Sequence, residues 1–169
     1  MQNSTLYIFS GLPASGKSTL AKKLAEKTGF TYLRIDTLEQ GLREICGITD
    51  IEGKGYALNH LIAKDNLLVG NNVIADMVNG WELTRNDWNN VATSVGSSFV
   101  NIQIICSDEK EHRHRVENRD VGIKNLILPT WDEVINREYH EWTMPRILID
   151  TAGKSLEESF NQLLSELKI

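Results

Sequence analysis

An eight-residue segment near the start of the chain has the glycines, lysine and serine needed to bind a row of phosphate groups. It begins at Gly11, ends at Ser18 and fits the pattern G-x-x-x-x-G-K-[S/T]. The glycines allow backbone conformations that point several N–H groups at phosphate oxygens, and the helix predicted to follow adds its dipole. Lys17 is expected to reach the β- and γ-phosphates, and Ser18 to bind Mg²⁺. The residues expected to contact the nucleotide here are Gly11, Leu12, Pro13, Ala14, Ser15, Gly16, Lys17, Ser18 and Thr19. No N-K-x-D element follows, so ATP is expected rather than GTP.

Two aspartates at the ends of apolar segments could complete a site for phosphoryl transfer. Asp36 follows the apolar segment Tyr32–Ile35, and Asp76 closes the segment Val73–Ala75. The carboxyl ends of parallel strands border the crevice of an open α/β sheet, so both carboxylates are expected there. Asp36 could then accept the proton of a substrate hydroxyl, and Asp76 could hold Mg²⁺ directly or through a water. The alternatives are a helix N-cap for Asp36 and a turn-forming role for Asp76.

Three further polar residues suit substrate recognition. Asn79 and Arg85 follow Asp76 along the same edge of the predicted sheet, and Arg85 is expected to bind a phosphate or carboxylate group. Arg43 comes seven residues after Asp36, about two helical turns along, and could point at an anionic substrate. The alternatives are a surface loop with a helix cap for Asn79–Arg85 and a solvated side chain for Arg43. The predicted substrate-binding residues are Asp36, Arg43, Asn79 and Arg85.

A highly charged segment, 107–119, follows the fourth apolar segment and has helical spacing. His112, Arg115 and Arg119 fall on one face, and the Arg113–Glu117 pair falls on another. The alternative to a functional role is a solvated helix held by ion pairs within the segment. The segment contains no interleaved aromatic side chains, and neighbouring acids offset its positive charge, so it is not typical of a nucleic-acid surface.

Short apolar segments alternate along the chain with stretches of helical length. This rhythm is typical of βαβ units, and near-continuous apolar strands are typical of a parallel sheet covered on both faces. The sequence therefore predicts an α/β fold in a single domain. The predicted strands are Leu6–Ser10, Tyr32–Ile35, Val73–Asp76, Val100–Cys106 and Ile147–Asp150.

Helix starts are marked by four segments that fit or approximate a capping box. Pro129–Trp142 is predicted to be helical, and Asp120–Pro129 to be a mobile loop. The helix predicted after residue 155 has an apolar stripe that suits packing on the sheet. The four capping segments begin at Thr37, Thr84, Thr130 and Ser155.

Composition excludes several classes of protein. The chain has 169 residues, 41% of them hydrophobic, and a net charge of −5. It is long enough to bury a core without disulfides, and its acidic balance argues against nucleic acid as the main partner. Cys46 and Cys106 lack metal-ligand spacing and are expected to be ordinary buried thiols. The N-terminal segment is not typical of a signal peptide, and no apolar run reaches membrane-spanning length, so a cytoplasmic location is expected.

The motif and its surroundings resemble the P-loop small-molecule kinases. The loop lies near the N-terminus, and the short segment Leu33-Arg34-Ile35-Asp36 follows about twenty residues later, as in adenylate, gluconate and shikimate kinases. The stretch Ile35–Leu38 is similar to the chloramphenicol phosphotransferase and zeta-toxin branch. The stretches IADMVN, TRNDW, CSDEKEHRHRVE and PTWDEVINREYHEW also resemble a group of AAA-type ATPases or kinases.

This resemblance implies a three-layer P-loop NTPase fold, with helices on both faces of a five-stranded parallel sheet in the order 2-3-1-4-5. It implies one P-loop kinase-like domain over 1–169, with a lid around 107–142. ATP and Mg²⁺ are the implied cofactors. The implied catalytic residues are Lys17, Asp36, Arg115 and Arg119, with the two arginines closing on the phosphates. The backbone near Thr151 is implied to pass the adenine.

The function that follows is transfer of the γ-phosphate of Mg-ATP to a hydroxyl group of a small molecule. One alternative is a kinase acting on the 5′-hydroxyl of a polynucleotide or nucleoside. Another is a regulatory module that binds and hydrolyses ATP without a phosphoryl acceptor. No membrane partner is expected, and the identity of the acceptor and the oligomeric state stay open at this stage.

Overall fold

Five parallel strands form one sheet in the computed structural model, which describes residues 4–169. The first three residues of the N-terminal segment discussed above lie outside the described part. The strand order is β2-β3-β1-β4-β5, which confirms the predicted order. The strands are β1 (Thr5–Ser10), β2 (Thr31–Arg34), β3 (Val73–Asp76), β4 (Ser98–Ile105) and β5 (Ile147–Asp150).

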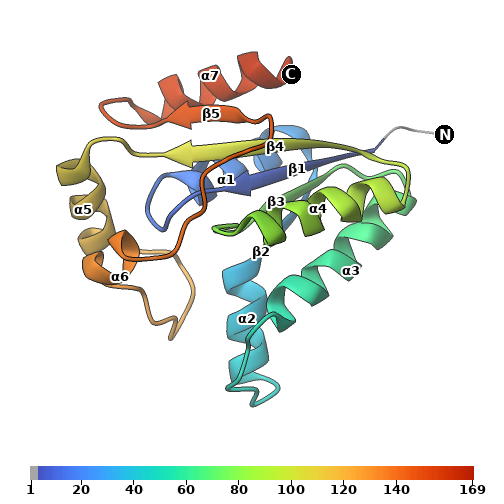
Figure 1. The fold of residues 1–169 in the computed structure, drawn as a ribbon, viewed down its shortest axis with the longest axis horizontal. Helices are drawn as coiled ribbons and strands as arrows, with labels where there is room; N and C mark the ends of the chain where they lie inside the picture. Colours follow the sequence, from blue (N-terminus) through green and yellow to red (C-terminus); the bar gives the residue numbers. More distant parts are fainter. Residues whose placement is uncertain (1–3) are drawn as a thin grey trace.

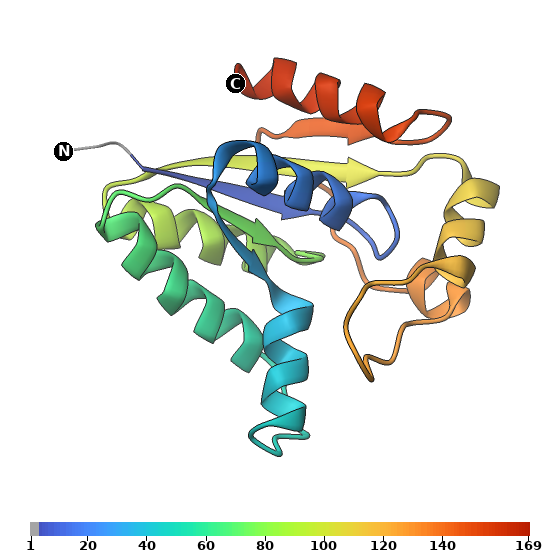
Figure 2. The same ribbon diagram turned by 180° about the vertical axis from the view of Figure 1, so that it is seen from behind.

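Helices connect the strands and cover both faces of the sheet (Figures 1 and 2). The α5 and α6 helices lie apart from the sheet, beyond the carboxyl end of β4 (Figure 1). The helices are α1 (Lys17–Thr28), α2 (Ile35–Glu44), α3 (Lys54–Leu68), α4 (Glu82–Ser94), α5 (Glu109–Asn118), α6 (Trp131–Ile135) and α7 (Leu156–Leu167). None of the helices over 4–169 is long and apolar enough to cross a membrane.

Alternating side chains of the central strands build a separate core on each face of the sheet. Ile8 contributes to a core with α3 and α4, whereas the next residue, Phe9, contributes to a core with α1 and α7. Successive residues of a strand point to opposite faces, so both must be apolar where both faces are covered. This is why the strands read as continuous apolar runs, and all five were predicted to within two residues at each end.

Two of the four predicted helix starts are confirmed, and two are wrong. Thr130 and Ser155 form complete capping boxes with Glu133 and Glu158. The α2 helix instead begins at Ile35, directly after β2, so Thr37 lies inside its first turn. The α4 helix begins at Glu82, and the Thr84 hydroxyl donates to the Trp81 carbonyl rather than capping the helix.

The prediction of a helix over Pro129–Trp142 was wrong beyond its first turns, because α6 ends at Ile135. The backbone after α6 is held by contacts from elsewhere in the chain. The amide of His140 donates to the carbonyl of Gly80, with N and O 2.7 Å apart, and Arg85 binds the carbonyls of His140 and Glu141. These tertiary bonds outweigh the local helical pattern. The thiols were also mispredicted in part, since Cys106 is buried but Cys46 is exposed.

Candidate active site

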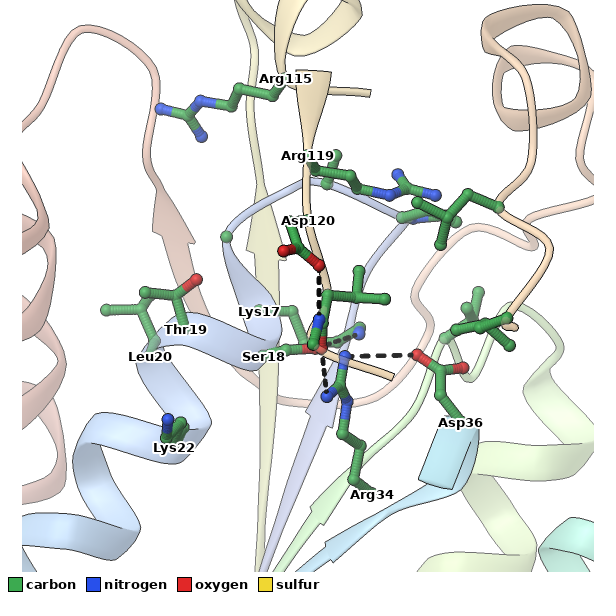
Figure 3. Close-up of a pocket in the computed structure, with 18 of the residues that line it drawn as sticks. Lys17, Ser18, Thr19, Leu20, Lys22, Arg34, Asp36, Arg115, Arg119 and Asp120 are labelled. Carbon is green, nitrogen blue, oxygen red and sulfur yellow. Dashed lines mark hydrogen bonds and ion pairs between the residues drawn. The ribbon is translucent and has the colours of Figure 1, made fainter. Parts of the chain in front are cut away.

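A cavity of about 1,910 Å³ opens at the carboxyl ends of the strands. Its walls come from the loop before α1, the first turns of α2, the end of α5 and the loop that follows α5. Figure 3 shows Lys17 and Ser18 in its middle, Arg34 and Asp36 on the α2 side, and Arg115 and Arg119 on the α5 side. The topology therefore brings together side chains that lie about 100 residues apart in the sequence.

The phosphate-binding loop has the backbone that its glycines allow. Gly11 has a φ of 151° and Gly16 a φ of 97°, both unfavourable for other residues. A Cβ atom on Gly11 would collide with the carbonyl oxygen of Ile104, and one on Gly16 would lie 3.2 Å from the side chain of Thr151. Gly16 also forms the N-cap of α1, so the loop ends where the helix exposes its free N–H groups.

Lys17, at the start of α1, forms an ion pair with Asp76 at the end of β3. The Lys17 Nζ atom lies 3.0 Å from one carboxylate oxygen of Asp76 and 3.4 Å from the Ser18 hydroxyl. The phenol of Tyr32 donates to the other carboxylate oxygen at 2.7 Å. Burial alone would raise the pKa of Asp76, but Lys17, Tyr32 and Ser18 outweigh it and hold that pKa below its usual value.

Asp76 and Ser18 offer hard oxygen donors of the kind that Mg²⁺ prefers. No cluster of three or more His, Cys, Asp and Glu side chains that could bind a metal by itself occurs within residues 4–169. A magnesium ion bound by Asp76 and Ser18 would complete its coordination with phosphate oxygens and waters, as is usual in phosphoryl-transfer sites. The donor set fits such an ion.

Asp36 is the second residue of α2, and its side chain is 43% exposed to solvent and lines the cavity. The Oδ2 atom of Asp36 lies 3.9 Å from a guanidinium nitrogen of Arg34, the last residue of β2. Another nitrogen of Arg34 donates to the carbonyl of Val121 at 3.0 Å. The carboxylate is thus open to a small molecule, beside a cation that is fixed to the loop after α5.

The α5 helix and its C-terminal end carry the two arginines that sequence spacing singled out. Arg115 donates to the hydroxyl and carbonyl oxygens of Thr151 at 2.8 and 3.1 Å, and pairs with Glu111. The Thr151 hydroxyl in turn donates to the Ser15 carbonyl at 2.8 Å. Arg119 faces the cavity beyond the helix end. The ion pairs of the alternative interpretation, Glu111–Arg115 and Arg113–Glu117, are also present.

A second set of contacts joins α5 to the phosphate-binding loop. The Nε2 atom of His112 lies 2.8 Å from the carbonyl oxygen of Pro13. Leu12 and Ala14 pack against a small buried cluster formed by α5 and α6. The cluster consists of Val116, Trp131 and Val134. Residues 12–14, which the motif leaves unspecified, therefore hold α5, the first helix of the predicted lid, against the loop.

The structure places Asn79 and Arg85 away from the cavity, although both were expected to bind substrate. Arg85 is fully buried, and its guanidinium donates to the carbonyls of Asn79, Gly80, His140 and Glu141 at 2.7 to 3.1 Å. Asn79 is also fully buried and binds the Phe9 carbonyl and the Ser10 hydroxyl. Both side chains therefore hold backbone segments in place, at the ends of β1 and β3 and at residues 140–141. Arg43 lines the cavity, and its guanidinium lies 3.6 Å from Glu39.

Two cavity residues were missed as site candidates in the sequence, Tyr32 and Arg34. Both lie on β2, which pairs with β3 so that Arg34 is opposite Asp76. Tyr32 and Arg34 are two residues apart, so their side chains lie on the same face of the strand, and this spacing was the signal in the sequence that could have pointed to them. Their partners, Asp76 and Val121, lie 44 and 87 residues away along the chain.

Comparison with known proteins identifies the family and the fold of the chain. A family model described as "AAA domain" matches residues 6–125. The cytidylate kinase of Ignicoccus hospitalis is 28% identical over 163 residues, covering 90% of this chain and 85% of that protein. A gluconokinase from Sinorhizobium meliloti superposes with a TM-score of 0.68 at 16% identity, over 99% of this chain and 92% of that one.

The APS kinase of Mycobacterium tuberculosis, in complex with AMPPNP and APS, has a TM-score of 0.64 at 20% identity and 99% coverage of both chains. These likenesses confirm the P-loop kinase fold. The family model covers most of the sequence, so the protein belongs to this AAA domain family.

Proposed function

We propose that the protein is a kinase that transfers the γ-phosphoryl group of ATP to a hydroxyl group of a small molecule. The observation that carries this proposal is the open carboxylate of Asp36 in the cavity that also contains Lys17 and Ser18. A carboxylate in this position can accept the proton of an acceptor hydroxyl, as transfer to an alcohol requires. Relatives that are named kinases of cytidylate and gluconate support a small acceptor.

The residues from Gly11 to Thr19 hold the triphosphate in this proposal. Backbone N–H groups at the start of α1 bind phosphate oxygens, and Lys17 leaves Asp76 to contact the β- and γ-phosphates. Ser18 and Asp76 hold the magnesium ion, which neutralises charge on the phosphates when it is bound. The APS kinase in complex with AMPPNP supports ATP as the nucleotide. Thr151 of this chain lines the cavity that would hold it.

Transfer requires the acceptor oxygen to stand in line with the γ-phosphorus atom. The new bond joins this oxygen to phosphorus as the bond to the β-phosphate oxygen breaks, and ADP leaves with the electron pair. The acceptor proton passes to the carboxylate of Asp36. Arg119 stabilises the negative charge on the moving phosphoryl group, in the manner of an internal arginine finger.

The segment 107–142 acts as a lid over this reaction. Its first helix is fixed by His112 to the Pro13 carbonyl and by Arg115 to Thr151, so the start of the lid is anchored to the phosphate-binding loop and to the end of β5. Arg115 contacts the nucleotide phosphates only if it exchanges its bonds with Thr151 for bonds to the ligand. Arg43 contributes to the acceptor wall of the cavity. The whole chain forms one domain in this proposal.

The proposal is tested by ADP release from Mg-ATP in the presence of pooled hydroxylated metabolites, nucleosides and 5′-hydroxyl oligonucleotides. Wild type is compared with Asp36→Asn and with Asp50→Asn, a matched change at a residue outside the cavity. We expect at least one pool to stimulate wild type and Asp50→Asn, with a loss of about 10²–10⁴-fold in Asp36→Asn. Equal slow ADP release with every pool in all three proteins would refute the kinase and favour a hydrolytic module.

A further inference from the structure

Positive charge is concentrated in the cavity of an otherwise acidic protein. Ten of the 18 Lys and Arg residues line it, but only four of the 23 Asp and Glu residues do so. Some of these cations surround the phosphate-binding loop and suit the triphosphate. Others lie on the acceptor side, where the triphosphate does not account for them: Arg34, Arg43 and Arg137.

Arg34 is the most constrained of the acceptor-side cations. Its side chain is 18% exposed, and the Nε atom is buried without a hydrogen-bond partner among residues 4–169. One terminal nitrogen binds the Val121 carbonyl, and the other lies 3.9 Å from Asp36, beyond hydrogen-bond distance. A largely buried cation with an unused donor costs free energy, and a ligand that supplied an acceptor would offset this cost.

Arg119 shows the same deficit on the opposite wall. One of its terminal nitrogens is buried without a partner among the described residues. Burial lowers the pKa of Arg119, Asp36 raises it, and the positive charge of Arg137 lowers it again. Arg119 also has no ion pair within 4.0 Å among residues 4–169, and the Glu39 carboxylate in the same cavity is paired with Arg43. The negative charge of Asp36 is therefore shared by more than one cation.

We infer that the acceptor carries an anionic oxygen group, a phosphate or a carboxylate, which Arg34 binds next to the hydroxyl that faces Asp36. This inference rests on the proposed function and names the class of its substrate. The spacing of Arg34 and Asp36 places the anion within a few bonds of the reacting hydroxyl. A guanidinium can bind either anion through two parallel N–H bonds, and Arg34 has its Nε–H free for one of them.

The test observes the Arg34 Nε–H directly by ¹⁵N–¹H NMR. The protein is saturated with Mg-AMPPNP, which fills the triphosphate site, and is then titrated with inorganic phosphate, acetate or glycerol. Arg34→Gln identifies the resonance by removing it, and Arg113, an exposed arginine of α5 outside the cavity, is the internal control. We expect a saturable chemical-shift change of the Arg34 signal with phosphate or acetate and none with glycerol. The Arg113 signal should show no saturable change with any of the three. The anion that saturates at lower concentration identifies phosphate or carboxylate.

Equal shifts with glycerol, or no saturable shift with any probe, would overturn the inference. So would a loss of AMPPNP affinity of tenfold or more in Arg34→Gln relative to Arg113→Gln, because Arg34 would then belong to the nucleotide site. A failure of this test can be distinguished from a failure of the proposed function. If the protein transfers phosphoryl groups but the Arg34 signal does not shift with anions, the kinase function is supported and the anionic acceptor is refuted. If the Arg34 signal shifts with anions but no phosphoryl group is transferred, the anion site is supported and the kinase function is refuted.

Discussion

At the level of single residues, Asp76 shows how the site stabilises a buried negative charge. It is 1% exposed, yet both carboxylate oxygens accept hydrogen bonds, one from Lys17 and one from Tyr32. The phenol is a dependable donor, because burial and the neighbouring Asp76 charge raise the pKa of Tyr32. Tyr32 therefore fixes one face of the carboxylate and leaves the other face for Lys17 or a metal.

The lowered pKa of Asp76 predicts a loss of stability in acid. A carboxyl group whose pKa is lower in the folded state stabilises the fold above its unfolded pKa, about 4, and this contribution is lost as the pH falls through the folded value. We expect the urea-derived free energy of unfolding to fall with pH below about 4 in wild type and in Asp50→Asn, and less steeply in Asp76→Asn. Equal slopes in Asp76→Asn and wild type would contradict this assignment.

Arg85 is predicted to affect stability rather than acceptor binding. Replacement by Met fills the space but leaves the carbonyls of residues 79, 80, 140 and 141 without their charged donor. Unfolding in urea should show a loss of about 3–5 kcal/mol, the range for removing one partner of a buried charged network. Unchanged stability with weakened acceptor binding would instead support the role that the sequence suggested.

At the level of elements, the capping segments distinguish local signals from tertiary ones. The Ser155 hydroxyl accepts from the Glu158 amide, and the Ser155 amide donates to the Glu158 carboxylate, whereas the Thr84 hydroxyl donates to the Trp81 carbonyl and caps nothing. We therefore predict that Ser155→Ala lowers the free energy of unfolding by about 1 kcal/mol. Thr84→Ala should cost less than about 0.5 kcal/mol, as is usual for a surface substitution. A larger loss for Thr84→Ala than for Ser155→Ala in thermal unfolding would refute this distinction.

The same contrast explains what could be predicted from the sequence. The five strands and the phosphate-binding loop depend on local patterns, namely apolar runs and a glycine motif, and they were found. Asp36 was singled out because it follows an apolar segment, and the structure places it in the first turn of α2, where it lines the cavity. Arg34 and the path of residues 136–142 depend on partners far along the chain, Val121 in one case and Arg85 in the other. Periodicity contains no information about such partners.

The charge distribution is a property of the whole molecule. The net charge is −5, but most of the charged side chains that line the cavity are Lys or Arg, so it attracts anionic ligands while the remaining surface does not. We predict that the affinity for Mg-ATP, measured by calorimetry, falls as NaCl is raised from about 50 to 300 mM, because salt screens such fields. The affinity for adenosine, which lacks phosphates, should change little. A parallel decrease for both ligands would show that the cavity charge does not act in binding.

The central claim, transfer to a hydroxyl group, is tested most directly by ³¹P NMR of wild type and Asp36→Asn with Mg-ATP and each acceptor pool. We predict that a phosphomonoester resonance grows in step with ADP in wild type and is strongly reduced in Asp36→Asn. Two results would contradict the claim. A new phosphoanhydride resonance would show that the acceptor is a phosphate group, and release of inorganic phosphate alone, equal in both proteins, would show that ATP is only hydrolysed.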